Sequence, residues 1–478
     1  MKITKKIKAN YEKWLRRKTI KILTQTEPSR IVKYGEDMVV PAFLRAARHL
    51  PAYAKFLQDK KVDLEKVKDL ETFKKFVPIV CKTDIFPQNE LKDYCLDAST
   101  EEVKSVMTSS GFSGVFSFGL NTEENLKKAE RSIDTALDYA FDISNRKTFL
   151  MNCLPMGVRV PTSLKYADTS VRLDMALAIF KKIIPEFDQV IFISDPHVIK
   201  NLLEEGIEQG IDWKKHCVHI IMGEDWISES MRGYLCHLLG SENMKREEGL
   251  VAITFGSAEL ELNLFHESVQ SIMIRQAAQK DKKLRYALFG EGVEVCPNIF
   301  HYYPHRSYIE TVSEPGGKPE LVFSMLSPTL LTPLMRYNIK DNGSLMSYDE
   351  LKKILEDNGY VHLAPELKLP LVILGGRNEK TLRIGNFSAS PEEIKQGIYE
   401  NFELAGATTG YFRLSVGDDK FKIEIQLRKN ITPDDALKNK FSEAIEKYIK
   451  GPKNICLYSY EEFPYSMELD YERKFKNV

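Results

Sequence analysis

Short apolar runs alternate with amphipathic stretches through the middle of the chain. The segments Gln189–Ile193, Val218–Met222 and Leu250–Phe255 are short and almost wholly apolar, which is typical of buried strands. Between them, residues 196–210 and 228–239 place apolar side chains at helical spacing. Strands that alternate with helices in this way predict an α/β fold, with a mainly parallel sheet covered by helices on both faces.

The two ends of the chain show different patterns. Residues 1–105 have the pattern of helices with charged faces, and closely spaced short strands around 290–336 predict a small β-rich subdomain. The segment after Gly375-Gly376 follows the order β-α-β-β-α-β of a small α+β sandwich. We therefore expect a large N-terminal domain of layered α/β structure, residues 1–375, and a small C-terminal α+β domain, residues 376–478.

Composition and charge exclude several classes of protein. The 478 residues are too many for one compact core, so two or three domains are expected. Lysine and arginine total 68, as do aspartate and glutamate, so no overall field attracts nucleic acid. No apolar stretch reaches the roughly 18 residues that a membrane helix needs, so we expect no integral membrane segment. The basic residues 2–21 are interpreted as a solvated helix face, with a membrane-surface contact as the alternative.

The cysteines indicate a reducing compartment. There are seven, an odd number, and they are scattered without a Cys-x-x-Cys pair. This is typical of reduced thiols, and we expect a cytoplasmic protein. The cluster His216-Cys217-Val218-His219 runs into an apolar strand, where neighbouring side chains point to opposite faces, so a metal is not expected there.

A loop rich in hydroxyl groups and glycine follows the strand predicted at Val103–Met107. It reads Thr108-Ser109-Ser110-Gly111-Phe112-Ser113-Gly114. Backbone N–H groups around the two glycines, together with the hydroxyls, could surround phosphate oxygens. The loop lacks the Gly-Lys-Ser/Thr ending of the common NTPase loop. Taken alone, the pattern is also that of an ordinary turn.

Two acids follow apolar runs and could serve a nucleotide. Asp341 comes at the end of a strand-like run, and a carboxylate there can accept both hydrogen bonds of a ribose diol. Glu259 follows Phe255-Gly256-Ser257-Ala258, and an acid at a strand end can hold Mg²⁺ that bridges phosphates. Each acid taken by itself is better explained as a polar turn residue.

In this order the motifs resemble those of the adenylate-forming superfamily, which includes the acyl- and aryl-CoA synthetases. The phenylacetate–CoA ligase-like branch is the most similar, and the resemblance covers roughly residues 75–478. The matching segments are Ser109–Gly114, Gly223-Glu224, Phe255–Glu259, Thr332–Tyr337 with Asp341, Gly376–Glu379 and Glu472–Val478. The resemblance implies that the small C-terminal domain is mobile and swings between two half-reactions.

The resemblance also implies which residues contact the nucleotide. Phe255 would stack on adenine and Asp341 would bind the ribose hydroxyls. The full set carried over is Ser109, Ser110, Gly111, Ser113, Gly114, Phe255, Gly256, Ser257, Asp341 and Arg377.

Further residues acquire catalytic or substrate roles by the same resemblance. Glu259 would hold Mg²⁺ and act in catalysis together with Lys474, and Glu379 would be the hinge acid. The substrate-binding residues carried over are Gly223, Glu224 and Thr254.

The chain departs from the family pattern in the phosphate loop. Phe112 replaces a residue with a hydroxyl donor, and Val115 stands where the family has a lysine. A charged hydrogen bond to phosphate contributes roughly 1.5–3 kcal/mol. Ala258, Lys340 and Glu379 are further differences. We therefore predict a divergent member.

The function implied is ATP-dependent activation of a small carboxylic acid, with release of pyrophosphate and formation of an acyl adenylate. Transfer to the thiol of coenzyme A is favoured. The alternatives are transfer to an amine or a carrier protein, or a regulatory nucleotide-binding pseudoenzyme. Apolar segments at 154–161, 220–224 and 254–256 predict an aryl or aliphatic acyl group. The sequence does not decide whether the protein forms a homodimer.

Overall fold

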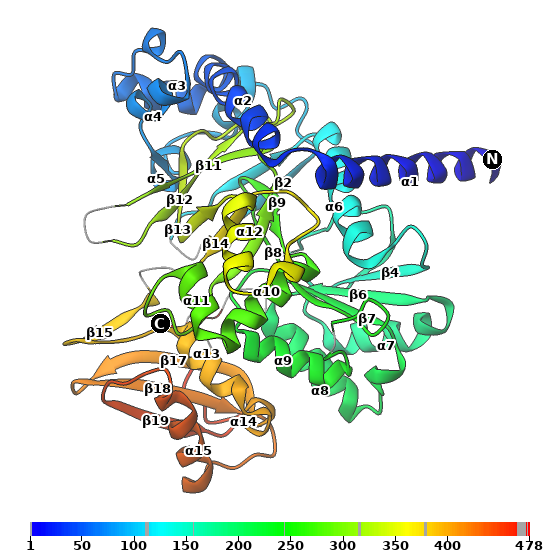
Figure 1. Cartoon of the computed structure of the whole chain (residues 1–478), viewed down its shortest axis with the longest axis vertical. Coiled ribbons are helices and arrows are strands. Elements are labelled where there is room, and N and C mark those ends of the chain that lie inside the picture. Colours follow the sequence, from blue (N-terminus) through cyan, green and yellow to red (C-terminus); the bar gives the residue numbers. More distant parts are fainter. Residues whose placement is uncertain are drawn as a thin grey trace.

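The computed structural model describes residues 2–109, 114–155, 157–242, 244–313, 317–376, 380–465, 475 and 477–478. Figure 1 shows the N-terminal helices above a central sheet, and the C-terminal elements below it. The cysteines, which all lie within these ranges, are free thiols. None of the described helices has the length and apolar character that would let it cross a membrane.

A parallel sheet occupies the middle of the chain, as the alternating pattern predicts. Its strand order is β5-β4-β6-β7-β8, and each neighbouring pair is parallel. The strands are β4 (Thr148–Asn152), β5 (Lys165–Asp168), β6 (Gln189–Ser194), β7 (Val218–Met222) and β8 (Val251–Ser257). The helices between them are α7 (Leu173–Ile183), α8 (Pro196–Glu208) and α9 (Glu229–Leu239). The α/β fold class is therefore confirmed.

The sheet continues past β8 through antiparallel pairs. Within the described residues twelve strands belong to it, and the order onward is β8-β9-β10-β14-β13-β12-β11, with β1 parallel to β13. The added strands are β1 (Val80–Cys81), β9 (Glu261–His266), β10 (Asn298–Tyr302), β11 (Ser307–Val312), β12 (Glu320–Met325), β13 (Tyr337–Met346) and β14 (Leu371–Leu374). The segment expected as a β-rich subdomain hydrogen-bonds into this larger sheet, and its boundaries at 290–336 stay a prediction.

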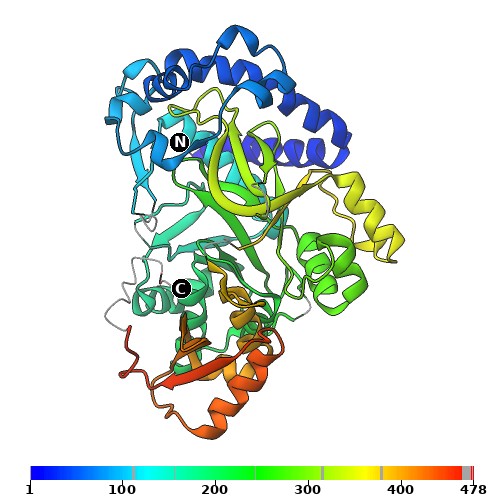
Figure 2. The same cartoon turned by 90° about the vertical axis from the view of Figure 1, so that its left-hand side faces the viewer.

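The start of the chain is mainly helical, and further helices cover the sheet (Figures 1 and 2). They are α1 (Lys2–Gln25), α2 (Pro28–His49), α3 (Pro51–Asp59), α4 (Leu70–Phe76), α5 (Lys82–Ile85), α6 (Glu123–Phe141), α10 (Val269–Lys280), α11 (Lys282–Phe289) and α12 (Tyr348–Asp357). The hairpin of β2 (Ser105–Thr108) and β3 (Phe118–Asn121) flanks the hydroxyl-rich loop. Thr122 accepts a hydrogen bond from the backbone N–H of Asn125 and begins α6, as its N-cap pattern predicts.

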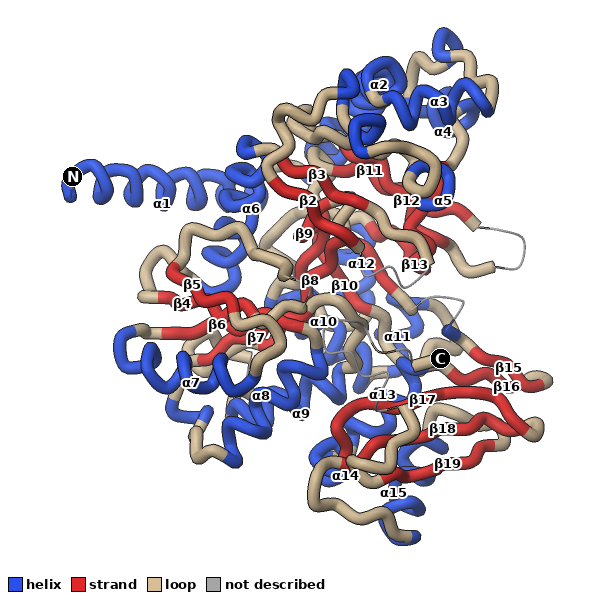
Figure 3. The backbone as a smooth tube through the Cα atoms, turned by 180° about the vertical axis from the view of Figure 1, so that it is seen from behind, coloured by secondary structure: helices blue, strands red, loops and turns tan. Residues whose placement is uncertain are grey.

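The C-terminal elements form sheets of their own (Figure 3). In order they are β15 (Leu382–Ile384), β16 (Phe387–Ala389), α13 (Pro391–Glu400), α14 (Phe402–Ala407), β17 (Thr408–Gly417), β18 (Lys420–Leu427), α15 (Asp435–Glu446) and β19 (Lys453–Tyr458). Strands β17 and β18 form an antiparallel hairpin, which matches the two consecutive strands of the predicted order, and β19 lies parallel to β18. The first strand differs from the predicted sandwich, because β15 pairs with β16 across the tight turn at Gly385 (φ +54°).

The C-terminal elements rest on the helices of the parallel sheet. Helix α13 packs against α9, and the hydroxyl of Ser230 donates to the carbonyl of Gln396 at 2.9 Å. The ammonium of Lys200, on α8, donates to the carbonyl of Thr408 at 2.6 Å. These contacts place the start of β17 beside the carboxyl ends of the parallel strands, where ligands bind in open α/β sheets.

Candidate active site

One cavity of about 630 Å³ lies at this edge, lined by strand ends, loops and the C-terminal residues Tyr411 and Phe475. It brings together nine of the residues predicted for the site, which are Ser109, Gly223, Glu224, Thr254, Phe255, Gly256, Ser257, Glu259 and Asp341. Gly114 is exposed and does not line it. Ser110, Gly111, Ser113, Arg377, Glu379 and Lys474 lie outside the described residues.

The end of β8 forms the floor of the cavity. Phe255 stacks on Phe265 of β9, with ring centroids 5.2 Å apart and an interplanar angle of 17°. The pairing of β8 with β9 shifts register between Phe255 and Ser257. Gly256 is required at this irregularity, because a Cβ there would lie 2.2 Å from the carbonyl oxygen of Leu262. The sequence motif therefore has a local structural reason.

Glu259 presents one carboxylate oxygen without a hydrogen-bond partner among the described residues. Its Oε1 accepts a hydrogen bond from the buried hydroxyl of Tyr337 at 3.0 Å. Its Oε2 is buried and has no hydrogen-bond partner among the described residues. Burying a carboxylate oxygen without a partner costs free energy, and a cation bound to that oxygen would offset the cost. The described residues contain no cluster of three metal-ligating side chains, and a magnesium ion held by one carboxylate would take its other oxygens from phosphate and water.

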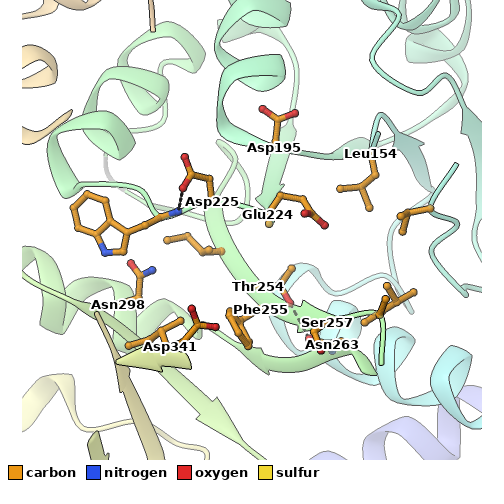
Figure 4. Close-up of a pocket in the computed structure, with 18 of the residues that line it drawn as sticks. Leu154, Asp195, Glu224, Asp225, Thr254, Phe255, Ser257, Asn263, Asn298 and Asp341 are labelled. Carbon is orange, nitrogen blue, oxygen red and sulfur yellow. Dashed lines mark hydrogen bonds between the residues drawn. The ribbon is translucent and has the colours of Figure 1, made fainter. Parts of the chain in front are cut away.

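Asp341 lies within β13, whereas the sequence predicted the end of a strand. The first half of β13 pairs with β12 and the second half, from Gly343, pairs with β14. At this change of partner the pairing with β12 is irregular, and Lys340 adopts a left-handed φ of +66°. Strained backbone of this kind is common at functional sites. Figure 4 shows Asp341 beside Phe255 on one side of the cavity.

Asn298, the first residue of β10, is a site residue that sequence reasoning missed. Its side chain is buried, and its Oδ1 has no hydrogen-bond partner among the described residues. Figure 4 places it close to Asp341 and Phe255. Nothing in the local pattern marks this asparagine, because it reaches the cavity only through the pairing of β10 with β9 and β14.

Three carboxylates form the opposite wall. Asp195 caps α8, accepting from the backbone N–H groups of His197 at 2.8 Å and Val198 at 3.1 Å, and burial raises its pKa to about 6. Glu224 adopts a φ of +70°. Burial alone would raise the pKa of Asp225, but the ammonium of Lys395 on α13 binds this carboxylate and holds its pKa below the usual value. The site thus contains a buried contact between the two parts of the chain.

The far end of the cavity is apolar. Figure 4 shows Leu154 on the side away from Asp341, with Glu224 and Thr254 between them. The lining there includes the segment predicted for the acyl group and also one face of α6, which the sequence did not indicate. These residues are Ile133, Ala136, Leu137, Ala140, Leu154, Val158 and Val160. The arrangement can hold a polar ligand at one end and an apolar group at the other.

Known proteins identify the fold. No protein-family model and no curated protein matches the chain. Among solved structures, 2-hydroxyisobutyryl-CoA ligase in the postadenylation state with R3-HIB-AMP is similar, with a TM-score of 0.66 and 12% identity over 94% of this chain and 89% of that chain. Its open conformation with 2-HIB-AMP and CoA gives a TM-score of 0.54 at 13% identity, over 91% of this chain and 90% of that chain.

A further structure of this ligase, with 2-HIB-AMP and CoA in the thioesterification state, gives a TM-score of 0.54 at 14% identity, over 91% of this chain and 87% of that chain. The chain therefore has the fold of an adenylate-forming CoA ligase, as the motif order predicted.

Proposed function

We propose that this protein is an AMP-forming acid–thiol ligase. A carboxylate oxygen attacks the α-phosphorus of ATP, the bond to the β-phosphate oxygen breaks, and pyrophosphate leaves. The thiol sulfur of coenzyme A then attacks the acyl carbon, loses its proton, and displaces AMP. The observation that carries the proposal is one cavity with a polar end built around Phe255, Glu259 and Asp341 and an apolar end around Leu154.

The polar end would bind the nucleotide. The ring of Phe255 offers a face for adenine, and Asn298 offers an unpaired amide oxygen to its amino group. The carboxylate of Asp341 would accept hydrogen bonds from the ribose hydroxyls. Glu259 would hold Mg²⁺ through its free oxygen, and the ion when bound would neutralise charge on the phosphates.

The apolar end would bind the acyl group of the acid. Its walls come from α6 and the segment after β4, and they carry no described charged side chain beyond the carboxylates near Glu224. An aliphatic or aryl acid fits these walls better than a highly charged one. The hydroxyl of Thr254 donates to Asn263 and to the carbonyl of Phe265, both at 2.9 Å, so its place between the two ends is held by the sheet.

The comparisons support a conformation closer to the postadenylation state than to the thioesterification state. The same ligase gives a TM-score of 0.66 in the postadenylation state and 0.54 in the thioesterification state. In our proposal Lys474 and Arg377 would contact the nucleotide in the first half-reaction, and the chain would turn about Glu379 before the second.

Pyrophosphate release from ATP with a panel of carboxylic acids, with and without coenzyme A, tests the proposal. We expect turnover that depends on both an acid and coenzyme A. Asp341→Ala and Glu259→Gln should each reduce it by about a hundredfold or more, because each removes a charged contact to the nucleotide or its ion. Asp349→Ala, on the exposed start of α12, is the matched control.

The alternatives give distinct results in this assay. Turnover that needs no coenzyme A would identify an amine or a carrier protein as acceptor. Binding of ATP without turnover of any acid would identify a regulatory nucleotide-binding protein and would contradict the proposed reaction.

A further inference from the structure

Lys82 is a cavity residue that none of the sequence motifs contains. It is the first residue of α5, directly after β1, and it lines the cavity. Strand β1 pairs with the start of β13, with Val80 opposite Tyr337 and Cys81 opposite Asn338. The carboxylate of Asp84 also accepts a hydrogen bond from the backbone N–H of Cys81 at 2.7 Å. The backbone that carries Lys82 is thus held beside the strand of Asp341 by contacts that do not involve its ammonium.

The ammonium of Lys82 is directed to the start of the hydroxyl-rich loop. Its Nζ donates to the hydroxyl of Ser109 at 2.8 Å. That hydroxyl also accepts from the backbone N–H of Ser117 at 3.0 Å, and the N–H of Ser109 donates to the carbonyl of Ser117 at 3.0 Å. Ser109 is therefore held on both sides of the hairpin, and Lys82 reaches it from a separate segment.

The charges that line the cavity leave a specific need for this cation. ATP carries more negative charge than AMP, and the additional charge lies on its terminal phosphates. The loop itself offers a valine at position 115, not a charged side chain. Lys340 and Lys380 also line the cavity. The ammonium of Lys340 binds Glu320 at 3.1 Å, and Lys380 acts on Asp225, whose pKa it helps to lower. Lys82 is the cation that the described structure places on Ser109.

We propose that Lys82 binds the terminal phosphates of ATP and gives the cavity its preference for ATP over AMP. The inference rests on the proposed function, because it assumes that the cavity binds adenine nucleotides. An ammonium supplies a point charge with three donors, so it can keep Ser109 and still bind a phosphate oxygen. In this arrangement the charge that stabilises departing pyrophosphate comes from α5 and not from the loop.

Equilibrium titration of the whole protein with AMP and with MgATP separates this role from a structural one. The variants are Lys82→Met, which keeps the apolar stem, Lys82→Arg, which keeps the charge, and Ser109→Ala, which removes only the hydroxyl. Lys92→Met is the matched control, because Lys92 is exposed and paired with Glu90.

We expect Lys82→Met to weaken MgATP binding by between about tenfold and a hundredfold and AMP binding by less than about twofold. Lys82→Arg should retain most of the preference for ATP, and Ser109→Ala should lose less of it than Lys82→Met. Equal weakening of both nucleotides by Lys82→Met would assign the residue to the fold, and unchanged MgATP binding would exclude the contact. Either result overturns the inference while leaving the proposed function intact.

Wild-type protein that binds neither nucleotide would instead overturn the proposed function, and this inference with it. The AMP titration therefore distinguishes the two failures.

Discussion

Two groups of buried ion pairs lie next to the cavity, and they differ in which parts of the protein they connect. The first, which we call the framework cluster, consists of Glu229, Arg232, Glu267 and Arg275, all within the large N-terminal part. The second, the joint cluster, consists of Asp225 with Lys395 and of Lys200, Glu204 and Arg428, and it links that part to the C-terminal elements. The first connects helices α9 and α10 to Glu267, which directly follows β9. The second connects two parts that must separate if the proposed swing occurs.

The framework cluster is fully satisfied and dry. The guanidinium of Arg232 binds both oxygens of Glu267, at 2.7 and 3.0 Å, and both side chains are 0% exposed. Glu267 also accepts from the backbone N–H of Ile253 in β8, at 2.8 Å. Arg275 binds Glu229 at 2.8 Å and the carbonyl of Ile227 at 2.7 Å. The cluster thereby holds both β8 and the loop that follows Glu224.

The joint cluster is as buried as the first at Lys200 and Glu204, whose side chains are 0% and 4% exposed, but it is less enclosed at its other pairs. The Lys395 side chain is 4% exposed, but its partner Asp225 is 23% exposed. Arg428 binds Glu208, whose side chain is 63% exposed. Charges near water can be rehydrated when the partner leaves, whereas charges in a dry core cannot. Similar ion pairs can therefore hold one part of the molecule together permanently, or form a contact between two parts that can be released.

Breaking the framework cluster should have the largest effect. Arg232→Met leaves Glu267 buried without its cation, and we expect a loss of about 3–5 kcal/mol in the free energy of unfolding. Chemical denaturation measures it, with the exposed Arg383→Met as control. Adding Glu267→Gln to Arg232→Met should recover part of the loss, since it removes the uncompensated charge. A loss below about 1 kcal/mol in the single variant would show that the framework cluster does not hold the N-terminal part together.

Asp195 lies beside the joint cluster, and its hydrogen-bond donors within the described part of the chain are the backbone N–H groups of His197 and Val198. Because burial raises its folded pKa to about 6, above its unfolded value near 3.8, the folded state binds the proton more strongly. This stabilisation is fully present below about pH 4 and is lost as the pH rises through 6. Between pH 4 and pH 7, Asp195→Asn should remove up to about 3 kcal/mol of the change in the free energy of unfolding. Identical stability profiles for wild type and variant across this range would exclude the shift.

Removing the cation from the joint cluster should cost less than removing Arg232. Lys395→Met removes the cation that binds Asp225, so burial acts with less opposition and the pKa of this carboxyl rises. We expect a loss of about 1–2 kcal/mol, because Asp225 can regain water when the C-terminal part moves away. Small-angle X-ray scattering should show a larger radius of gyration. An unchanged radius together with a loss as large as that of Arg232→Met would make the two clusters equivalent.

The smallest effect is expected at the rim of the joint. Arg428 binds Glu208 and lies 3.6 Å from Glu204, and its side chain is 26% exposed. Arg428→Ala should change the free energy of unfolding by less than about 1 kcal/mol, because exposed ion pairs are screened by water and salt. The same denaturation assay checks this. A loss comparable with that of Lys395→Met would show that Arg428 contributes as much stability as the buried ion pair of the joint cluster.

The elements of the parallel sheet were predictable because each depends on a local pattern. The runs at β6, β7 and β8 are apolar over a strand length, and α8 and α9 begin at Asp195 and Ser228, which cap them. The motif around Phe255 and Gly256 was identified by its resemblance to a known family and lies at the end of one of these strands. These signals lie within a few residues of one another, so they need no knowledge of distant segments.

Site residues that arrive through strand pairing were not predictable. Asn298 and Lys82 reach the cavity because β10 joins β9 and because β1 joins β13. Asp341 was identified as a candidate, but its place at an irregular change of partner in the middle of β13 depends on β12 and β14. The register between distant strands is set by the whole sheet and not by the residues of one strand.

By itself, the sequence determined the α/β character of this protein, the order of its central elements and most of the motifs that line the cavity. Local spacing of apolar and polar residues suffices for the elements, since helix and strand differ in period. The motifs were identified by their resemblance to a known family. Only the tertiary structure decided which charges are buried together, because ion pairs such as Arg232 with Glu267 and Lys395 with Asp225 join segments far apart in the chain. Burial and partner together set the energy of a charge, and both are properties of the folded molecule.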